Sequence, residues 1–348
     1  MTDRDALAGP APVWDVINGY SAYWALCAAL DLGLFDRLAA GERTAAELAA
    51  DVVHDPEDAE LLAEVLVSLG LLESDGWHYR LTPSSRRFLV TSSPASMADL
   101  VRFSPGPHRG WPTLSSTLAA GAPDPATTAE LDRIYPALVR ATSGTQRVVA
   151  GRVASELRER GLLPSDATVV DFGCGSGVWL AELLAAADGG HAVAVDRAHV
   201  LAEAERTLAG RPVAFVAGDY LDAVLPVGRA DVVVLAHVLR AEPPERARAL
   251  VDRALDLLAG HGVLVVADYF RPDRVPGPGP DRSPTRTAAR HELLLSLTMR
   301  ASTYGRGVTV AELDGWLAEH GAEPLAVLDP LPRQRVRLIS PQQRNGSR

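Results

Sequence analysis

Three glycines at alternate positions mark the part of the chain best suited to holding a small ligand. Gly173, Gly175 and Gly177 lie in the stretch DFGCGSG, directly after an apolar run that ends in Asp171. Glycine is used where the backbone takes a positive φ or where a ligand must come close to the main chain. The spacing differs from the GxGxxG of pyrophosphate-binding loops. By itself the pattern also suits a tight turn between a strand and a helix.

Polar side chains follow the next two apolar runs. Asp196 ends HAVAVD, and Asp219 and Tyr220 end VAFVAGDY. The first carboxylate can accept hydrogen bonds from both hydroxyls of a ribose. Asp219 can accept a hydrogen bond from an adenine amino group, and Tyr220 can flank the ring. Because the carboxyl ends of successive parallel strands meet at one crevice, we expect these groups to surround one ligand.

The elements that position these residues alternate along the second half of the chain. Short apolar runs (ATVVDFG, HAVAVD, VAFVAGD, ADVVVLAHV and GVLVVADYF) are each followed by a helical segment rich in alanine, leucine and arginine. This alternation predicts a parallel sheet with helices on both faces. Two further strands, PLAVLDPL and RQRVRLIS, follow the helix TVAELDGWLAEHG. A terminal hairpin of this kind is not part of the usual dinucleotide-binding fold.

The first part of the chain predicts a different, mainly helical body. Residues 13–40 carry apolar side chains at helical spacing on more than one face, so we expect them to be buried between two bodies. Thr44 and Asp55 suit helix N-caps and Gly70 suits a helix stop. GWHYRLT alternates like a short hairpin. Helix, turn, helix and hairpin in this order is the winged-helix pattern.

Charge argues against nucleic acid as a partner. The chain has 348 residues and a net charge of −10, and residues 1–105 hold seven arginines and no lysine against sixteen acidic residues. A DNA-binding helix needs cations to neutralise phosphates. We therefore expect a dimerisation domain, and neither nucleic acid nor a membrane as partner. Two cysteines without paired spacing, no membrane-length apolar stretch and no signal pattern predict a cytoplasmic protein.

These motifs together resemble a known family. DFGCGSG, Asp196, GDY and the terminal hairpin are similar to the class I S-adenosylmethionine-dependent methyltransferases. LDLGLFDRLAAGERTAAELAADV, LGLLESDGWHYRLTP and HRGWPTLSSTLAAGAP resemble the winged-helix dimerisation domain and linker of small-molecule O-methyltransferases of the caffeate and polyketide-tailoring type. The resemblance covers nearly the whole chain. It implies an α/β fold, with a Rossmann-like domain built on a mostly parallel seven-stranded sheet and a mainly helical N-terminal domain that forms a homodimer.

The resemblance also implies domain boundaries, a cofactor and site residues. It assigns residues 1–105 to dimerisation, 106–166 to a helical linker that contributes to the acceptor pocket, 167–340 to the methyltransferase domain and 341–348 to a polar tail. The cofactor is S-adenosylmethionine. Its predicted binding residues are Ser143, Gly173, Gly175, Asp196, Gly218, Asp219, Tyr220 and His237. The predicted walls of the acceptor pocket are Trp111, Tyr135 and Met299, although each of these also suits plain core.

The chain departs from this family at the general base. Typical members carry LHDW after the fourth strand, with the His as base and two glutamates that orient it. This chain reads HVLRAEPPE, which puts Arg240 at the His position and Glu242 at the Trp position, while Asp268 and Gly307 stand where the glutamates are expected. Arginine cannot accept a proton at neutral pH. Arg240 either binds a carboxylate or stabilises an acceptor anion, or it pairs with Asp268 and only fills the vacated space.

His237 and His291 are the remaining candidate bases. His237 lies three residues before Arg240, near the expected cofactor, and also suits the cofactor wall or the core. His291, in ARHELLLSLTM, belongs to the helix that lines the acceptor pocket in relatives, and also suits a solvent-facing position. With Asp268 these histidines lack the short spacing of metal ligands, so no metal is expected.

The function that follows is methyl transfer to a small natural product, at an aromatic or polyketide-like hydroxyl or an activated carbon. Loss of a general base raises the activation free energy by roughly 3–5 kcal/mol. Correct positioning of the two reactants supplies about 7–11 kcal/mol, so transfer can proceed without the base. The alternative is a non-methylating tailoring enzyme, for cyclisation, decarboxylation or hydroxylation, that keeps the cofactor as a scaffold.

Overall fold

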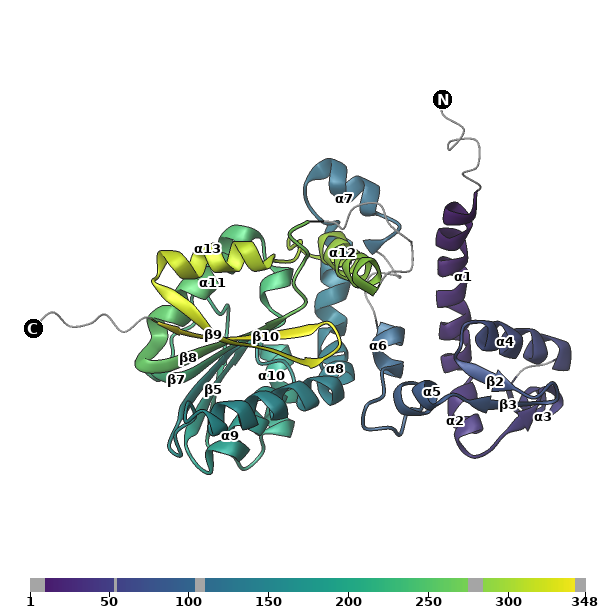
Figure 1. Ribbon diagram of the computed structural model, residues 1–348, viewed down its shortest axis with the longest axis horizontal. Coiled ribbons are helices and arrows are strands. Elements are labelled where there is room, and N and C mark those ends of the chain that lie inside the picture. The colour runs from purple at the N-terminus through teal and green to yellow at the C-terminus, as the bar shows by residue number, and fades with distance from the viewer. Residues whose placement is uncertain (1–9, 53–54, 104–109, 275–283, 342–348) are drawn as a thin grey trace, which may run out of the picture. The chain divides into compact units, whose positions relative to one another are not determined.

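The computed structural model describes residues 10–52, 55–103, 110–274 and 284–341, and the chain divides between residues 103 and 104 into two compact units (Figure 1). The elements of the first unit are α1 (Ala11–Asp31), α2 (Leu34–Ala39), β1 (Arg43–Thr44), α3 (Ala45–Val52), α4 (Pro56–Ser68), β2 (Leu72–Ser74), β3 (His78–Leu81), α5 (Pro83–Phe88) and α6 (Ala98–Phe103).

The elements of the second unit are more numerous. They are α7 (Leu114–Ala120), α8 (Pro125–Glu159), β4 (Thr168–Phe172), α9 (Val178–Ala187), β5 (His191–Asp196), α10 (Ala198–Thr207), β6 (Val213–Ala217), β7 (Ala230–Ala236), the 3₁₀ turn η2 (Leu239–Ala241), α11 (Pro244–Leu257), β8 (Leu258–Asp268), α12 (Pro284–Ser302), α13 (Val310–Glu319), β9 (Ala322–Leu331) and β10 (Gln334–Pro341).

The first unit has the predicted winged-helix layout. Thr44 caps α3, because its hydroxyl accepts from Glu47 N at 3.3 Å while the Glu47 carboxylate accepts from Thr44 N at 2.8 Å. Asp55 caps α4, and Gly70 ends that helix with a φ of +71°. Behind these helices lies a three-stranded antiparallel sheet in the order β1-β3-β2. GWHYRLT supplies only β3, since its partner β2 comes from the preceding residues LES.

The first helix is only partly covered by its own unit. Near its C-terminus, Ala29 and Leu30 are buried in the core of the unit. Towards its N-terminus an apolar face is exposed, at i, i+3, i+4 and i+7 spacing. Its members are Val13, Trp14, Val16, Ile17, Tyr20 and Trp24, which are 39% to 76% exposed. This is the stretch whose sequence predicts burial between two bodies.

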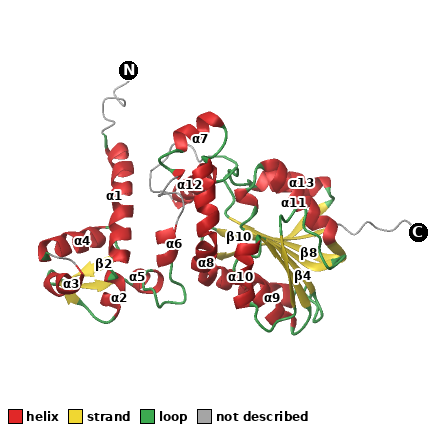
Figure 2. Cartoon of the chain, turned by 180° about the vertical axis from the view of Figure 1, so that it is seen from behind, coloured by secondary structure: helices red, strands yellow, loops and turns green. Residues whose placement is uncertain are grey.

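The second unit is built on one seven-stranded sheet in the order β6-β5-β4-β7-β8-β10-β9 (Figures 1 and 2). Strands β4 to β8 are parallel, and the terminal hairpin β9–β10 is antiparallel. Helices α8, α9 and α10 cover one face, while α11 and α13 cover the other. The apolar strands are buried on both faces, which confirms the predicted mostly parallel sheet. The strand order reverses beside β4, and this is where such sheets bind ligands.

A single long helix links the start of the second unit to its sheet. α8 begins where the Asp124 side chain accepts from Ala126 N, and it continues for 35 residues through Pro136. Its C-terminal half buries Val149, Val153 and Leu157 against the sheet unit. The segment predicted as a linker is therefore mainly this helix, and it belongs to the second unit. Among the described helices, none combines the length and apolar character needed to cross a membrane.

Candidate functional site

The glycine loop joins β4 to α9 in a conformation that other residues could not adopt easily. Gly173, Gly175 and Gly177 have φ values of +77°, +55° and +75°. A Cβ on Gly173 would lie 2.4 Å from Val238 Cγ1, and one on Gly177 would lie 2.8 Å from Leu208 Cδ1. The loop therefore has positive-φ backbone and close packing, and it follows β4, beside which the strand order reverses.

Asp196 closes one side of this loop. Its Oδ2 accepts from Gly175 N at 2.9 Å and its Oδ1 from Arg197 N at 2.8 Å. Its backbone carbonyl accepts from Gly218 N at 3.0 Å. The residue is 7% exposed, and burial raises its pKa although both backbone hydrogen bonds oppose this effect. Three of the predicted cofactor residues, Gly175, Asp196 and Gly218, are therefore in direct contact.

Asp171 was not among the predicted site residues, and the structure brings it to the same place. It is the last but one residue of β4 and is 1% exposed, and neither carboxylate oxygen has a hydrogen-bond partner among the described residues. Burial, with the nearby Asp196, raises its pKa well above the ordinary value. In the sequence, only its position directly before the glycine loop indicates a role in this site. A buried acceptor without a partner suits a ligand with a cationic donor, such as the ammonium group of S-adenosylmethionine.

Asp219 and Tyr220 follow β6 and are held by the segment after β7. The Tyr220 hydroxyl donates to the Glu242 carboxylate. Arg246 Nε donates to Glu242 Oε2 at 2.7 Å, and Arg246 Nη2 donates to Asp219 Oδ2 at 2.7 Å. We call these four residues the latch. Glu242 stands at the family's Trp position, and no local pattern predicts that it holds Tyr220 and Arg246.

Arg240, His237 and Asp268 form one cluster. Arg240 Nη1 lies 3.2 Å from His237 Nδ1 and 3.7 Å from Asp268 Oδ1, and the guanidinium carbon lies 5.2 Å from the centre of the Tyr269 ring. His237 takes a φ of +61°, a strained conformation for a non-glycine residue. Burial lowers the pKa of His237, and the charge of Arg240 contributes in the same direction. The ring is therefore neutral at pH 7.

The position of the missing second acid is physically closed. Gly307 has a φ of +75°, and a Cβ there would lie 2.5 Å from Ser296 Oγ. Gly307 N donates to the carbonyl of Arg240 at 3.2 Å. A glutamate at this position would be strained by the positive φ, and the Ser296 side chain would have to move to make room for it.

Tyr135 reaches the same region from α8. The Arg197 guanidinium carbon lies 4.6 Å from the centre of its ring. Burial raises the pKa of the Tyr135 phenol, followed by the charge of Asp196, whereas Arg197 and Arg240 lower it. Tyr135 is therefore close enough to feel the charges of both Asp196 and Arg240. The sequence predicts it as an acceptor wall, and this position is compatible with that role.

The other predicted residues lie around the cluster or apart from it. The Ser143 hydroxyl donates to the Arg140 carbonyl of its own helix at 2.7 Å. Gly110, which precedes Trp111, packs against Ala301 of α12, since a Cβ on Gly110 would lie 3.1 Å from the Ala301 carbonyl oxygen. Met299 belongs to the same helix, so Trp111 and Met299 come from neighbouring parts of the second unit. No described hydrogen bond or ion pair joins His291 to the Arg240 cluster. No three His, Cys, Asp or Glu side chains gather as a metal site in the described parts of the chain.

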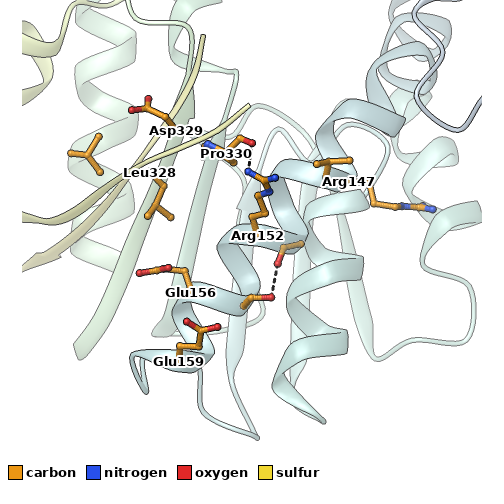
Figure 3. A pocket seen from close by; sticks show the side chains of 11 residues that line it. Arg147, Arg152, Glu156, Glu159, Leu328, Asp329 and Pro330 are labelled. Carbon is orange, nitrogen blue, oxygen red and sulfur yellow. Dashed lines mark hydrogen bonds between the residues drawn. The ribbon is translucent and has the colours of Figure 1, made fainter. Parts of the chain in front are cut away.

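A separate open groove lies between α8 and β9 (Figure 3). It has a volume of about 660 Å³, and none of the predicted site residues lines it. Its arginines are already engaged: Arg152 donates to the Pro330 carbonyl at 2.6 Å, and Arg147 lies 3.6 Å from Glu182. Glu156 pairs with Arg160 at 2.6 Å. The groove therefore offers less chemistry than the crevice at the glycine loop.

Comparison with known protein families gives two matches along the chain. Residues 14–91 match the model of the O-methyltransferase dimerisation domain. Residues 169–262 match a methyltransferase domain model. The second match contains the glycine loop, Asp196, the latch and Arg240.

Individual relatives extend over most of the chain. The N,N-dimethyltransferase OxyT of Streptomyces rimosus is 33% identical over 267 residues, 73% of this chain and 76% of the relative. The 3-hydroxy-5-methyl-1-naphthoate 3-O-methyltransferase of Streptomyces sahachiroi is 28% identical over 328 residues, 90% of this chain and 89% of the relative. The structure of human N-acetylserotonin methyltransferase in complex with SAM has a TM-score of 0.75 and 23% identity, and covers 98% of this chain and 99% of the human chain.

Proposed function

Because the chain belongs to the family of S-adenosylmethionine-dependent small-molecule methyltransferases with an O-methyltransferase dimerisation domain, we propose that it methylates an aromatic or polyketide-like natural product at a hydroxyl or activated carbon. The chain is a methyltransferase, and its cofactor is S-adenosylmethionine. The finer assignment of the acceptor is supported by the named substrate of the Streptomyces sahachiroi relative, a hydroxylated naphthoate. The non-methylating alternative is not favoured by these relatives.

The residues around the glycine loop would hold the cofactor. The loop backbone of Gly173 and Gly175 gives close access to the main chain, and Asp196 would accept from the ribose hydroxyls. Asp171, with no partner of its own, would accept from the ammonium group. Asp219, Tyr220 and Gly218 would form the adenine wall, which the latch holds in place. When bound, the cofactor supplies an electrophilic methyl group on a sulfonium.

The observation that carries this proposal is the convergence of Asp171, Asp196 and the positive-φ glycine loop at the reversal point of the sheet. The buried carboxylate of Asp171 has no partner among the described residues, so its burial is costly unless a ligand uses it. His237 and Ser143 remain candidates for the methionine end of the cofactor. Trp111, Tyr135 and Met299 remain candidates for the acceptor wall, where they would exclude water and orient the acceptor.

We also propose that the enzyme is a homodimer. The exposed apolar face of α1 includes two tryptophans, which suits a protein interface, and this helix belongs to the matched dimerisation domain. The acidic N-terminal unit supports a partner other than nucleic acid. Both cysteines, Cys27 and Cys174, are buried and unpaired, which suits a reducing compartment such as the cytoplasm.

The proposal is tested by binding and by product mass. Calorimetry should detect one S-adenosylhomocysteine per chain, and incubation of S-adenosylmethionine with a panel of hydroxylated naphthoates should yield products heavier by one methyl group. Absence of any S-adenosylhomocysteine binding would overturn the cofactor assignment. Turnover of an acceptor without added methyl mass would overturn the methyl transfer.

A further inference from the structure

The position of the family's general base holds a cation that is only partly satisfied. Among the described residues, Arg240 makes one ion pair, with Asp268, and the separation of 3.7 Å between Nη1 and Oδ1 is longer than a hydrogen bond. That carboxylate is already used by backbone groups: it accepts from Tyr269 N at 2.8 Å and from Arg240 N at 3.2 Å. With the described residues, the Nε and Nη2 groups of Arg240 make no hydrogen bond, and its side chain is 22% exposed.

The neighbouring histidine does not replace the base. Arg240 Nη1 can only donate, so His237 Nδ1 must be the acceptor of their 3.2 Å contact, and the ring proton lies on Nε2. Protonation of Nδ1 would break this contact and place two cations side by side, and burial lowers the pKa of the ring further. The cluster therefore holds a neutral histidine against an arginine, and the nitrogen facing that arginine is already occupied.

The backbone of Arg240 is packed closely against the loop of residues 305–307. Ser296 Oγ occupies the space into which a side chain at Gly307 would extend, and Gly307 N is bonded to the carbonyl of Arg240. A Cβ on Gly305 would lie 2.2 Å from that same carbonyl oxygen. Both glycines let the 305–307 loop pack directly against the backbone of Arg240. The guanidinium is held by the contact of Nη1 with His237, and its carbon lies over the ring of Tyr269, 5.2 Å from the ring centre.

A fixed guanidinium with free N–H groups recognises an anionic oxygen. Resting on the methyltransferase function proposed above, we propose that the acceptor is an acidic hydroxyl compound, an enol or phenol conjugated to a carbonyl, that binds as its anion against Arg240. No proton then has to be removed in the site. A lone pair of the anionic oxygen forms the new C–O bond, the S–CH₃ bond breaks with its electron pair moving to sulfur, and the negative and positive charges cancel.

The test uses binding probes, so that it does not depend on the natural acceptor. Calorimetry on the full-length enzyme saturated with S-adenosylhomocysteine compares 2-hydroxy-1,4-naphthoquinone, an acidic enol, with 1,4-naphthoquinone, its neutral match. We expect the enolate to bind more tightly by on the order of 10- to 150-fold, the range for a hydrogen bond to a charged group. Arg240→Gln should abolish this preference, and Arg240→Lys should keep part of it because the charge remains.

The control is Arg248→Gln, which removes the same charge from the surface of α11, where Arg248 pairs with Glu319. It should leave the preference for the enolate unchanged. Equal affinity of the two probes for the wild-type enzyme, or a preference that survives Arg240→Gln, would overturn the proposal. Failure of the wild-type enzyme to bind S-adenosylhomocysteine would instead contradict the proposed function, so the two failures are distinguishable.

Discussion

Asp196→Asn is the sharpest test of the cofactor site. The Asp196 carboxylate accepts two backbone hydrogen bonds, from Gly175 N and Arg197 N, and an amide has only one oxygen to offer. The amide NH₂ must face one of these N–H groups, and the negative charge offered to the ribose is lost. A hydrogen bond to a charged group contributes about 1.5–3 kcal/mol. We therefore expect affinity for S-adenosylhomocysteine to fall roughly 10- to 150-fold in calorimetry.

A matched control lies in the same sheet, at the amino ends of the parallel strands. Asp231 also accepts two hydrogen bonds, from Thr168 N at 2.9 Å and from His261 Nε2 at 2.9 Å. Asp231→Asn removes an equivalent carboxylate at the amino ends of the strands, so it should lower the melting temperature without changing affinity for S-adenosylhomocysteine. If both variants lost affinity by the same factor, the effect would be general destabilisation and the assignment of Asp196 to the cofactor would be refuted.

Three further predictions concern assembly, pH and the latch. Ile17→Glu, on the exposed face of α1, should convert a dimer into a monomer in light scattering, and an unchanged dimer would place the interface elsewhere. Because burial raises the pKa of Asp171, its ionisation lowers the stability of the folded state as pH rises above about 4. The melting temperature of Asp171→Asn should therefore exceed that of the wild type by a margin that grows with pH. The same variant should bind S-adenosylhomocysteine more weakly. A margin independent of pH would contradict the buried ionisation. Glu242→Gln weakens the hold on Tyr220 and Arg246, so it should raise the KM for S-adenosylmethionine with kcat retained; a fall in kcat alone would contradict a positioning role.

Local patterns were enough to predict the fold and the centre of the cofactor crevice. Alternating apolar runs and helices specify a parallel sheet, and the glycine loop and Asp196 follow from what the carboxyl ends of such strands present. The same reasoning found the departure at Arg240, because it depends on residue identity at a motif position. The fold prediction is confirmed because it rests on residues close together in the chain, whereas the assignment of the glycine loop and Asp196 to the cofactor stays a prediction.

The contacts that finish the site could not be predicted in this way. Glu242 bonds a tyrosine 22 residues earlier, and nothing local distinguishes it from a solvated glutamate. Asp171 is notable for having no partner, a property that exists only when every neighbour is placed. Ser296, in α12, occupies the space beside Gly307, which lies in the loop after that helix. Each depends on side chains meeting across the fold, where periodicity carries no information.

The segment from Arg240 to Arg246 belongs to two sites at once. The carbonyl of Arg240, the proposed acceptor residue, accepts from the 305–307 loop, while Glu242 and Arg246 hold Tyr220 and Asp219, the proposed adenine wall. Substitutions at positions 240 and 242 should therefore be epistatic rather than additive. Restoring the family's residue at one of these positions would disturb the contacts of the other. A change of acceptor therefore requires exchange of the whole segment together with the residues that contact it.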